Sequence, residues 1–466
     1  MRKIAMFCIP AHGHTNPMLP VAAELVKRGN TVRFYSFDEF GEKIAAIGAE
    51  FVSLSGFLPD LSEKEEQGLK SVKISEMTKQ DIRITILLND FFAEEFASFK
   101  PDVVYSDSAC FWGKLNAWKF GVPLVVSTST FAFNQMSSQY MKHSPAEMAD
   151  LIFGLPKMNA EMKKLEPLGY KTKSFLSLVS SDNDTDSVVY TSKGFQPFAE
   201  TFSDHYLFMG PSLRTNTAPD KDKPRPLIYI SMGTVINDRP DFYKNCIAAL
   251  GGMNADVVIS CGKTVDISSF GSLPENIRMF PTVDQLDVLS KTDVFITHCG
   301  MNSVSESLYM AAPLVLYPQT GEQEAVARRV HEIGAGEYLK DDSTESIKAA
   351  VTNILCNAAF AKAARNCCDE LRACPGVSGA AEFIENAPHT SDAPDPLKAL
   401  NRESGRYMWV FRIAVVILVV LTWVFLGKGY LWMIGVAVGV FSTPVRNTVS
   451  RYVFRKNYRG KAASVT

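Results

Sequence analysis

Two histidines separated by a single glycine stand in the stretch IPAHGHTNPMLP, directly after an apolar run. His12 and His14 could form part of a metal site, could include a catalytic base, or could be two polar residues of a loop. A histidine suits proton abstraction because its ordinary pKa of about 6.5 leaves the ring mostly neutral at pH 7. Two histidines alone do not make a zinc site, and the sequence suggests no convergent cysteine or carboxylate. We therefore expect no metal here, and a base or a loop residue remain the alternatives.

A catalytic histidine needs a group that fixes its tautomer, and Asp107 is the candidate for that position. Asp107 ends the apolar run PDVVYSD, which we predict to be a buried strand. The carboxyl ends of parallel strands in an open sheet face the same crevice, so Asp107 can lie beside His14. We expect a helix to begin at Pro17 with Asn16 as its cap, and its positive end should disfavour protonated His14. Alternatively, Asp107 caps the helix through FWGKLNAW and His14 is a loop donor.

A second candidate site lies in the stretch DVFITHCGMNSVSES. We predict a buried strand that ends at His298 and a helix a few residues later, with Gly300 allowing a tight turn. Asn302 or Ser303 would cap that helix. The free amides of such a helix start, together with its positive dipole end, bind phosphate groups. His298 could add a donor, and Glu306 could accept a hydrogen bond from a ribose hydroxyl. A purely structural turn is the alternative, since strand-to-helix turns with glycine are common.

The bulk composition is that of an ordinary folded protein. A chain of 466 residues suggests two domains, and 46% hydrophobic with 21% charged residues excludes disorder. The net charge of −2 excludes a chain-wide nucleic-acid binder, so we expect no nucleic-acid partner. Nine cysteines follow no disulfide or zinc spacing, which indicates reduced thiols in the cytosol. The opening MRKIAMFCIP has too short an apolar core for a signal peptide, and we predict a strand there.

The elements that must position these residues alternate along the chain. Strands are predicted at KIAMFCIP, TVRFYSF and EFVSL with helices between them, which is the βαβαβ pattern of a parallel sheet covered by helices. Proline, charged and polar residues interrupt this pattern, and a second alternation begins at LIYISMG. We predict an α/β protein of two facing Rossmann-like domains, residues 1–212 and 226–385, joined by a linker at 213–225, with a cleft between the carboxyl ends of both sheets.

The C-terminal part of the chain differs in composition. We predict a flexible polar spacer at 386–406, then an apolar segment at 407–441 in which Arg412 and Lys428 are the only charges. The uninterrupted apolar part has 14 residues, whereas a membrane span needs about 20, a length that is reached if Arg412 extends to the interface. Basic residues before this segment and in the tail at 442–466 favour a membrane hairpin with both ends cytoplasmic. An amphipathic or oligomerising helix pair is the alternative.

Several motifs of the chain, in the same order, resemble those of the UDP-glycosyltransferase superfamily, and particularly its bacterial macrolide-glycosyltransferase branch. The most specific is THCGMNSVSESLYMAAPLVLYPQTGEQ, which is similar to the family's nucleotide-sugar signature. MFCIPAHGHTNP, YSD, TSKGFQPFAETF, FMGPS and YISMGT extend the likeness to about residue 390. The resemblance implies the GT-B fold, an acceptor-binding N-terminal domain and a nucleotide-sugar-binding C-terminal domain. It implies no cofactor, with a UDP-sugar, UDP-glucose first of all, as co-substrate.

The resemblance also implies roles for individual residues, with His14 as catalytic base and Asp107 as its partner. This chain has TVDQ where the family often has an aromatic residue and a proline, and glutamate where the sugar-binding aspartate is commoner, so the nucleobase and sugar stay open. The implied donor residues are His298, Gly300, Asn302 and Ser303 at the diphosphate, Ser231, Gly233 and Thr234 beside it, Gln285 at the base, Glu306 at the ribose, and Glu322 and Gln323 at the sugar.

The function expected from these residues is inverting, metal-independent transfer of a hexose from a UDP-sugar to a hydroxyl of a hydrophobic small-molecule or lipid acceptor. The resemblance implies that the apolar segments at about 55–95 and 131–175 line the acceptor site, although core packing explains them equally well. The enzyme would lie at the cytoplasmic face of a membrane. A UDP-sugar epimerase on a similar scaffold, and an inactive membrane-tethered nucleotide-sugar-binding protein, are the alternatives.

The acidic stretch SDNDTDS has the D-x-D spacing of metal-dependent glycosyltransferases and the start of a calcium loop. A calcium loop would need a glycine and a glutamate at its twelfth position, where this chain has Lys193. The metal-dependent transferases would need a different fold. We therefore predict an Asp-rich surface turn and no metal site.

Overall fold

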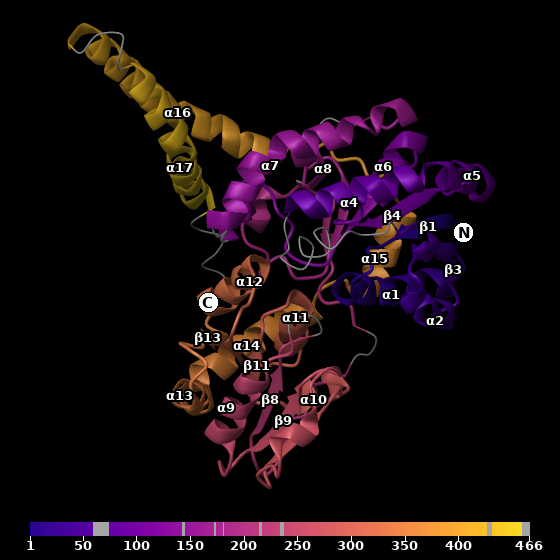
Figure 1. Ribbon diagram of the computed structural model, residues 1–466, viewed down its shortest axis with the longest axis vertical. Coiled ribbons are helices and arrows are strands. Elements are labelled where there is room, and N and C mark those ends of the chain that lie inside the picture. Colours follow the sequence, from indigo (N-terminus) through magenta and orange to yellow (C-terminus); the bar gives the residue numbers. More distant parts are fainter. Residues whose placement is uncertain are drawn as a thin grey trace.

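The computed structural model describes residues 1–58, 74–141, 145–171, 174–179, 181–213, 217–233, 237–425 and 431–458. Two parallel sheets, each between layers of helices, form two lobes, and a helical arm projects from the first (Figure 1). This arrangement confirms the prediction of two Rossmann-like domains in an α/β protein.

The first sheet has seven strands in the order β3-β2-β1-β4-β5-β6-β7, and the second has six in the order β10-β9-β8-β11-β12-β13. The strands of the first are β1 Lys3–Phe7, β2 Thr31–Ser36, β3 Glu50–Ser53, β4 Val103–Asp107, β5 Leu124–Thr128, β6 Asp186–Val189 and β7 Tyr206–Phe208. Those of the second are β8 Leu227–Ser231, β9 Asp256–Ser260, β10 Ile277–Phe280, β11 Val294–Thr297, β12 Leu314–Leu316 and β13 Gly336–Tyr338.

Helices cover both faces of each sheet. In the first lobe they are α1 His12–Lys27, α2 Asp38–Ala46, α4 Ile74–Leu87, α5 Asn89–Phe99, α6 Phe111–Phe120, α7 Pro145–Lys163 and α8 Phe175–Val179. The second lobe has α9 Pro240–Leu250, α10 Gln285–Lys291, α11 Met301–Tyr309, α12 Gly321–Glu332, α13 Thr344–Cys356 and α14 Ala358–Arg372. The chain ends with α15 Gly376–Glu385, α16 Pro396–Phe425 and α17 Leu431–Tyr458.

The apolar side chains of each central strand pack into two hydrophobic cores, one on each face of the sheet. In β1, Ile4 and Met6 pack into the core beneath α1, whereas Ala5 and Phe7 pack into the core on the opposite face. Successive side chains of a strand point to opposite faces, so a strand buried on both sides must be apolar throughout. This is why the central strands are continuous apolar runs and why polar residues appear only where a strand ends.

Both sheets change strand order at one point, and the candidate residues lie there. In the first sheet the order reverses between β1 and β4, and in the second between β8 and β11. Ligands of open α/β sheets bind in the crevice outside the strand ends at such a point. The chain therefore carries His14 and Asp107 to one switch point, and Ser231 and His298 to the other.

Helix α1 begins earlier than we expected, at His12 and not at Pro17. Ala11 is extended, and its carbonyl accepts the amides of His14 and Thr15 at 3.0 and 2.9 Å, which closes the first helical turn. Asn16 is consequently not the cap. Pro17 lies inside the helix, where it supplies no amide to the carbonyl of Gly13, four residues before it.

The chain passes between the two lobes twice, and the two connecting segments are hydrogen-bonded to each other. The amide of Gly376, at the start of α15, donates to the carbonyl of Met209 at 2.9 Å. Helix α15 then packs on α1, and Ala380, Ile384 and Ala387 belong to the core that includes Ile4. The boundary expected at 385 is therefore wrong, because α15 completes the first domain and not the second.

Residues 386–406 are packed and not a flexible spacer. The amide of His389 donates to Oδ2 of Asp186 at 2.8 Å, and α16 begins at Pro396. Asp186 and Asn183, both in the stretch expected to be a surface turn, are buried, and Asn183 bonds Asp395 at 2.7 Å. Part of that acidic stretch therefore anchors the returning chain, which sequence spacing alone does not reveal.

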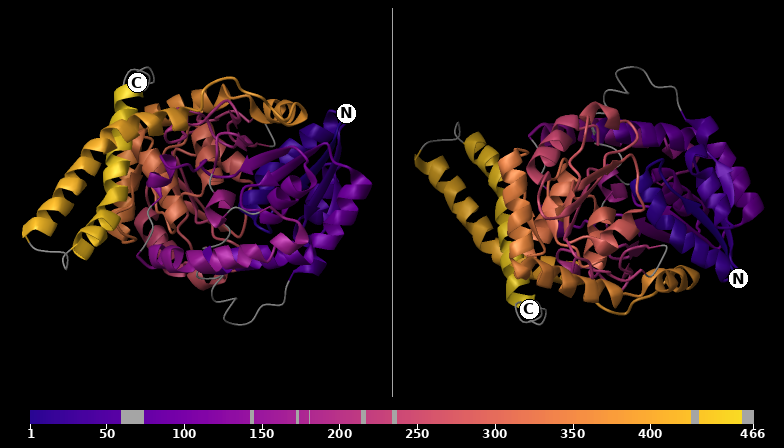
Figure 2. Two further views of the ribbon diagram at one scale, coloured as in Figure 1. Left: turned by 90° about the horizontal axis from the view of Figure 1, so that it is seen from above. Right: turned by 90° about the horizontal axis from the view of Figure 1, so that it is seen from below.

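Helices α16 and α17 form the arm, and they pack against each other (Figure 2). Leu400 and Val453, near the base of the arm, pack against Met136 of the first lobe. Among the described residues, one helix, Pro396–Thr422, is long and apolar enough to cross a membrane by length and composition alone.

Candidate active site

His14 and Asp107 lie within hydrogen-bond distance at the switch point of the first sheet. The Nδ1 atom of His14 is 2.9 Å from Oδ2 of Asp107. The Asp107 side chain is fully buried, whereas that of His14 is 28% exposed. The amide of Ala109 donates to the other Asp107 oxygen at 2.9 Å and holds the carboxylate in place. A carboxylate accepts, so Nδ1 of His14 carries the proton, and Nε2 is the ring atom that can take a proton from a substrate.

Ser129, which the sequence did not single out, also touches the ring. Its Oγ lies 3.1 Å from Nδ1 of His14. Ser129 directly follows β5, which is the neighbour of β4 in the sheet. Its place at the same edge of the sheet as Asp107 could therefore have predicted the contact with His14. The hydroxyl adds a second contact that limits rotation of the imidazole.

The pKa of His14 is raised to about 9, against the direction expected from its place at a helix start. Burial alone lowers this pKa, because a poorly solvated ring disfavours charge. The charge and hydrogen bond of Asp107 outweigh burial, and the charge of Glu322 raises the pKa further. A full carboxylate charge at 2.9 Å acts more strongly than the partial charge of a helix terminus. His14 must therefore lose a proton before it can act as a base.

His12 has a different partner and lies apart from this pair. Its Nε2 atom is 2.7 Å from Oε1 of Glu39, and its ring packs edge-on against Phe40 of α2. Two histidines that are separated by a single glycine thus face different neighbours.

His298 occupies a narrow space between two glycines. A Cβ atom added to Gly233 would lie 2.5 Å from the His298 ring, and one added to Gly300 would lie 2.6 Å from its Nε2. The left-handed residue of this turn is Cys299, with φ of 68°, and not Gly300, whose φ is −62°. Gly300 is therefore needed for close contact with the histidine, and not for the tight turn that we expected.

Burial lowers the pKa of His298 to about 4, and a bond with the Ser231 backbone opposes this only partly. The ring is therefore neutral at pH 7 and offers one N–H donor without a positive charge. Helix α11 begins directly after it with Gly300 as N-cap, and no side chain caps it. The expected capping by Asn302 or Ser303 is wrong, and the first-turn amides stay available to an anion.

A chain of polar contacts joins the residues expected at the base and the ribose. Nε2 of Gln285 donates to Oε2 of Glu306 at 2.6 Å and lies 3.3 Å from Oγ of Ser303. The hydroxyl of Tyr229 donates to the Gln285 carbonyl oxygen at 3.2 Å. Three residues that we predicted to bind the nucleotide sugar thus lie together. Tyr229 joins them, and the sequence did not single it out because it lies inside an apolar strand.

The start of α12 carries the remaining predicted residues. Glu322 is exposed and its charge acts on His14 across the cleft. Oε1 of Gln323 accepts the amide of Gln319 at 2.8 Å, so this side chain also orders its own loop. Thr234 lies outside the described residues.

One hydrogen bond connects the two halves of the site. Nδ2 of Asn302, in the first turn of α11, donates to the carbonyl of Gly13 at 2.9 Å. This is the carbonyl that Pro17 leaves without an amide partner in α1. The start of α1, which carries His14, and the uncapped start of α11 therefore face each other directly.

The sequence resemblance implies that UDP binds at His298, and on that expectation replacing Gly300 with alanine should weaken UDP binding by about tenfold or more, because displacing His298 removes one charge-assisted donor. The added Cβ would lie 2.6 Å from Nε2 and force the ring away. Calorimetric titration with UDP measures the effect. Gly56→Ala is the control, since a Cβ there meets nothing within 4 Å. Unchanged UDP affinity in Gly300→Ala would exclude His298 from the diphosphate site.

Comparisons with known proteins agree with this geometry. Residues 244–386 match the family described as erythromycin biosynthesis protein CIII-like, C-terminal domain. NDP-glycosyltransferase YjiC of Bacillus licheniformis is 33% identical over 82% of this chain and 97% of its own length. Demethyllactenocin mycarosyltransferase of Streptomyces fradiae is 30% identical over 83% and 86%.

The solved structures that resemble the chain are also glycosyltransferases. That of the kitacinnamycin glycosyltransferase has a TM-score of 0.69, with 26% identity, and covers 82% of this chain and 98% of its own. The calicheamicin glycosyltransferase structure has a TM-score of 0.67, with 25% identity over 83% and 97%. The fold is thus GT-B. The chain belongs to the UDP-glycosyltransferase superfamily, in its bacterial macrolide-glycosyltransferase-like branch, and is an enzyme that transfers sugars from nucleotide sugars.

Proposed function

We propose that the enzyme moves a hexose, glucose first of all, from a UDP-sugar to a hydroxyl of a hydrophobic small-molecule or lipid acceptor, with inversion and without a metal. The observation that supports this most directly is the hydrogen-bonded pair of His14 and Asp107 facing the uncapped start of α11. A base and an anion site on opposite walls of one cleft are what direct displacement at an anomeric carbon requires.

The proposed reaction follows from the positions of these groups. Nε2 of His14 takes the acceptor hydroxyl proton while the oxygen attacks the anomeric carbon from the face opposite the nucleotide. The bond from that carbon to the diphosphate breaks, and UDP leaves with the electron pair. Asp107 stabilises the imidazolium, while the amides of α11 and the neutral His298 stabilise the departing anion. Each such donor to a developing anion commonly contributes about 2.7–4 kcal/mol.

A UDP-release assay with UDP-glucose and a panel of hydrophobic hydroxylated acceptors tests this function. Transfer predicts UDP release that depends on the acceptor. An epimerase would change the sugar without any acceptor, and an inactive binding protein would bind UDP and release nothing. Because three of the similar solved structures are described as complexes with thymidine diphosphate (dTDP), a dTDP-sugar should be the second donor in the panel. Acceptor-independent turnover would overturn the proposal.

We further propose that the arm attaches the enzyme to the cytoplasmic face of a membrane. Trp409, Val410 and Val416 of α16 are 62%, 67% and 60% exposed. Large apolar side chains exposed along a helix are unfavourable in water, and the hydrocarbon of a bilayer accommodates them. A tethered enzyme would meet acceptors that partition into the membrane.

Introducing two aspartates, Val416→Asp with Val420→Asp, should move the protein from the membrane fraction to the soluble fraction. Charges at the centre of a span cost about 2.5–3.5 kcal/mol each on insertion scales. Cell fractionation measures the shift, and Val416→Ala with Val420→Ala is the control. Truncation after Ala393 is a harsher variant, because it also removes Leu400 and Val453 from Met136. An unchanged membrane fraction in the aspartate variant would contradict attachment.

A further inference from the structure

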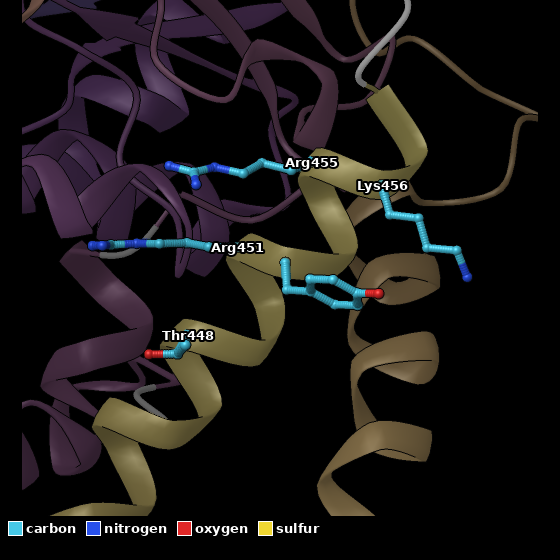
Figure 3. Close-up of a pocket in the computed structure, with 5 residues that line it drawn as sticks. Thr448, Arg451, Arg455 and Lys456 are labelled. Atoms are coloured by element: carbon cyan, nitrogen blue, oxygen red, sulfur yellow. The ribbon is translucent and has the colours of Figure 1, made fainter.

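A basic hollow lies at the base of the arm, where α17 meets the body of the protein. Its volume is about 590 Å³, and it is lined by Thr448, Arg451, Tyr452, Arg455 and Lys456. Arg451 and Arg455 extend in parallel from one side of α17, one turn apart, while Lys456 extends from another side (Figure 3). A smaller hollow beside it, of about 300 Å³, shares both arginines and adds Arg328 and Glu332 of α12.

Among the described residues, the basic side chains of this hollow form no salt bridge with the protein. Nε of Arg451 donates to the neutral amide oxygen of Gln139 at 2.5 Å, and Lys456 donates to the hydroxyl of Tyr407 at 3.1 Å. Within the described ranges, no carboxylate lies within salt-bridge distance of Arg451, Arg455 or Lys456. The acidic residue that lines the smaller hollow, Glu332, is already engaged by Arg328 at 3.1 Å and by the Tyr140 hydroxyl.

The hollow lies at the level where the exposed apolar surface of the arm begins. Tyr407 of α16 packs edge-on against Tyr452 of α17, with ring centroids 5.8 Å apart. The apolar surface of α16 starts at that turn, with Trp409 62% exposed. Aromatic and basic side chains gather at the headgroup region of a bilayer, where an aromatic ring meets both water and hydrocarbon. A membrane holding the arm would therefore place its headgroups at Arg451 and Arg455.

We propose that this hollow binds the phosphate of an anionic phospholipid in the leaflet that receives the arm. This rests on the proposed membrane attachment and adds a specific lipid class to it. Two parallel guanidinium groups can each form paired hydrogen bonds with phosphate oxygens. Their uncompensated charge favours a headgroup with net negative charge over one in which choline neutralises the phosphate. The bound headgroup would contact α17 beside α12 of the second domain and so orient the cleft over the membrane.

Titration of the full-length protein in an uncharged detergent tests the site with short-chain lipids. Dioctanoyl phosphatidylglycerol should bind at least about tenfold more tightly than dioctanoyl phosphatidylcholine, since each basic residue near an anionic surface contributes about 1 kcal/mol, or about fivefold. Arg451→Gln with Arg455→Gln should abolish that preference. The matched control is Arg402→Gln with Arg406→Gln, which removes the same charge from exposed positions of α16 outside the hollow.

Three results would overturn the proposal: equal binding of the two lipids, an intact preference in Arg451→Gln with Arg455→Gln, or inorganic phosphate competing as well as phosphatidylglycerol does. Arg455→Gln alone should weaken phosphatidylglycerol binding severalfold. It breaks no described hydrogen bond, so its thermal unfolding should be unchanged, which would separate the loss of binding from misfolding. Because the titration is made in detergent, it stands apart from the fractionation of the Val416→Asp and Val420→Asp variant, which tests attachment itself.

Discussion

Replacing His14 with alanine is expected to lower kcat for sugar transfer by about 10²–10⁴-fold, the contribution of a positioned general base. UDP binding should stay nearly intact, because His14 belongs to α1 of the first domain, whereas the uncapped start of α11 belongs to the second. Steady-state kinetics at saturating acceptor measures kcat, and calorimetry measures the dissociation constant of UDP.

His12→Ala is the matched control for this experiment. It removes the same kind of side chain two residues earlier in α1, where the ring contacts Glu39 and Phe40 instead of Asp107. We expect kcat within a few-fold of the wild-type value for this variant. Full activity in His14→Ala, or an equal loss in both variants, would refute the assignment of His14 as the base.

Replacing Asp107 with asparagine should lower kcat by up to about 10⁴-fold, as the loss of an orienting aspartate does in other histidine bases. The amide would present a donor to Nδ1 of His14 and so favour the tautomer with the proton on Nε2, the atom that must accept one. Asp107 is fully buried, and an asparagine side chain is nearly the same size as an aspartate side chain, so the fold should survive. Unchanged thermal unfolding would separate this effect from destabilisation.

The pH dependence gives this variant a second readout. With Asp107 present, the pKa of His14 is about 9, and the neutral base is scarce at pH 7. The value of kcat/KM should therefore rise with pH, reach half of its maximum near pH 9 and level off above that in the wild-type enzyme. Without the carboxylate charge of Asp107, only the charge of Glu322 opposes the effect of burial on the pKa of His14, so in Asp107→Asn this limb moves to lower pH. A limb at the same pH in both proteins would show that Asp107 does not control His14.

The sequence predicted what depends on strand ends and on family motifs. A strand buried on both faces must be apolar, so the polar residues that follow β1, β4, β8 and β11 stand out, and topology brings them to two switch points. The pairing of His14 with Asp107 follows from this, as does the position of His298 before a helix. The roles of the donor residues stay predictions.

Other features depend on contacts that no local pattern encodes. The start of α1 is set by the carbonyl of Ala11 and not by Pro17, so the expected helix start was wrong. The pKa of His14 is set by several opposing effects. Which of them is largest can be decided only when the 2.9 Å distance between His14 and Asp107 is known. Helix α15 looks like any amphipathic helix, and only its packing on α1 shows to which domain it belongs.

The late position of α15 in the chain affects the order in which the two domains can fold during synthesis. The core of the first domain includes Ala380, Ile384 and Ala387, which lie beyond the whole of the second sheet. The N-terminus of a chain leaves the ribosome first, and N-terminal domains therefore usually fold before C-terminal ones. Here the domain that begins first cannot close its core until the other has been synthesised, so the second domain can finish folding before the first.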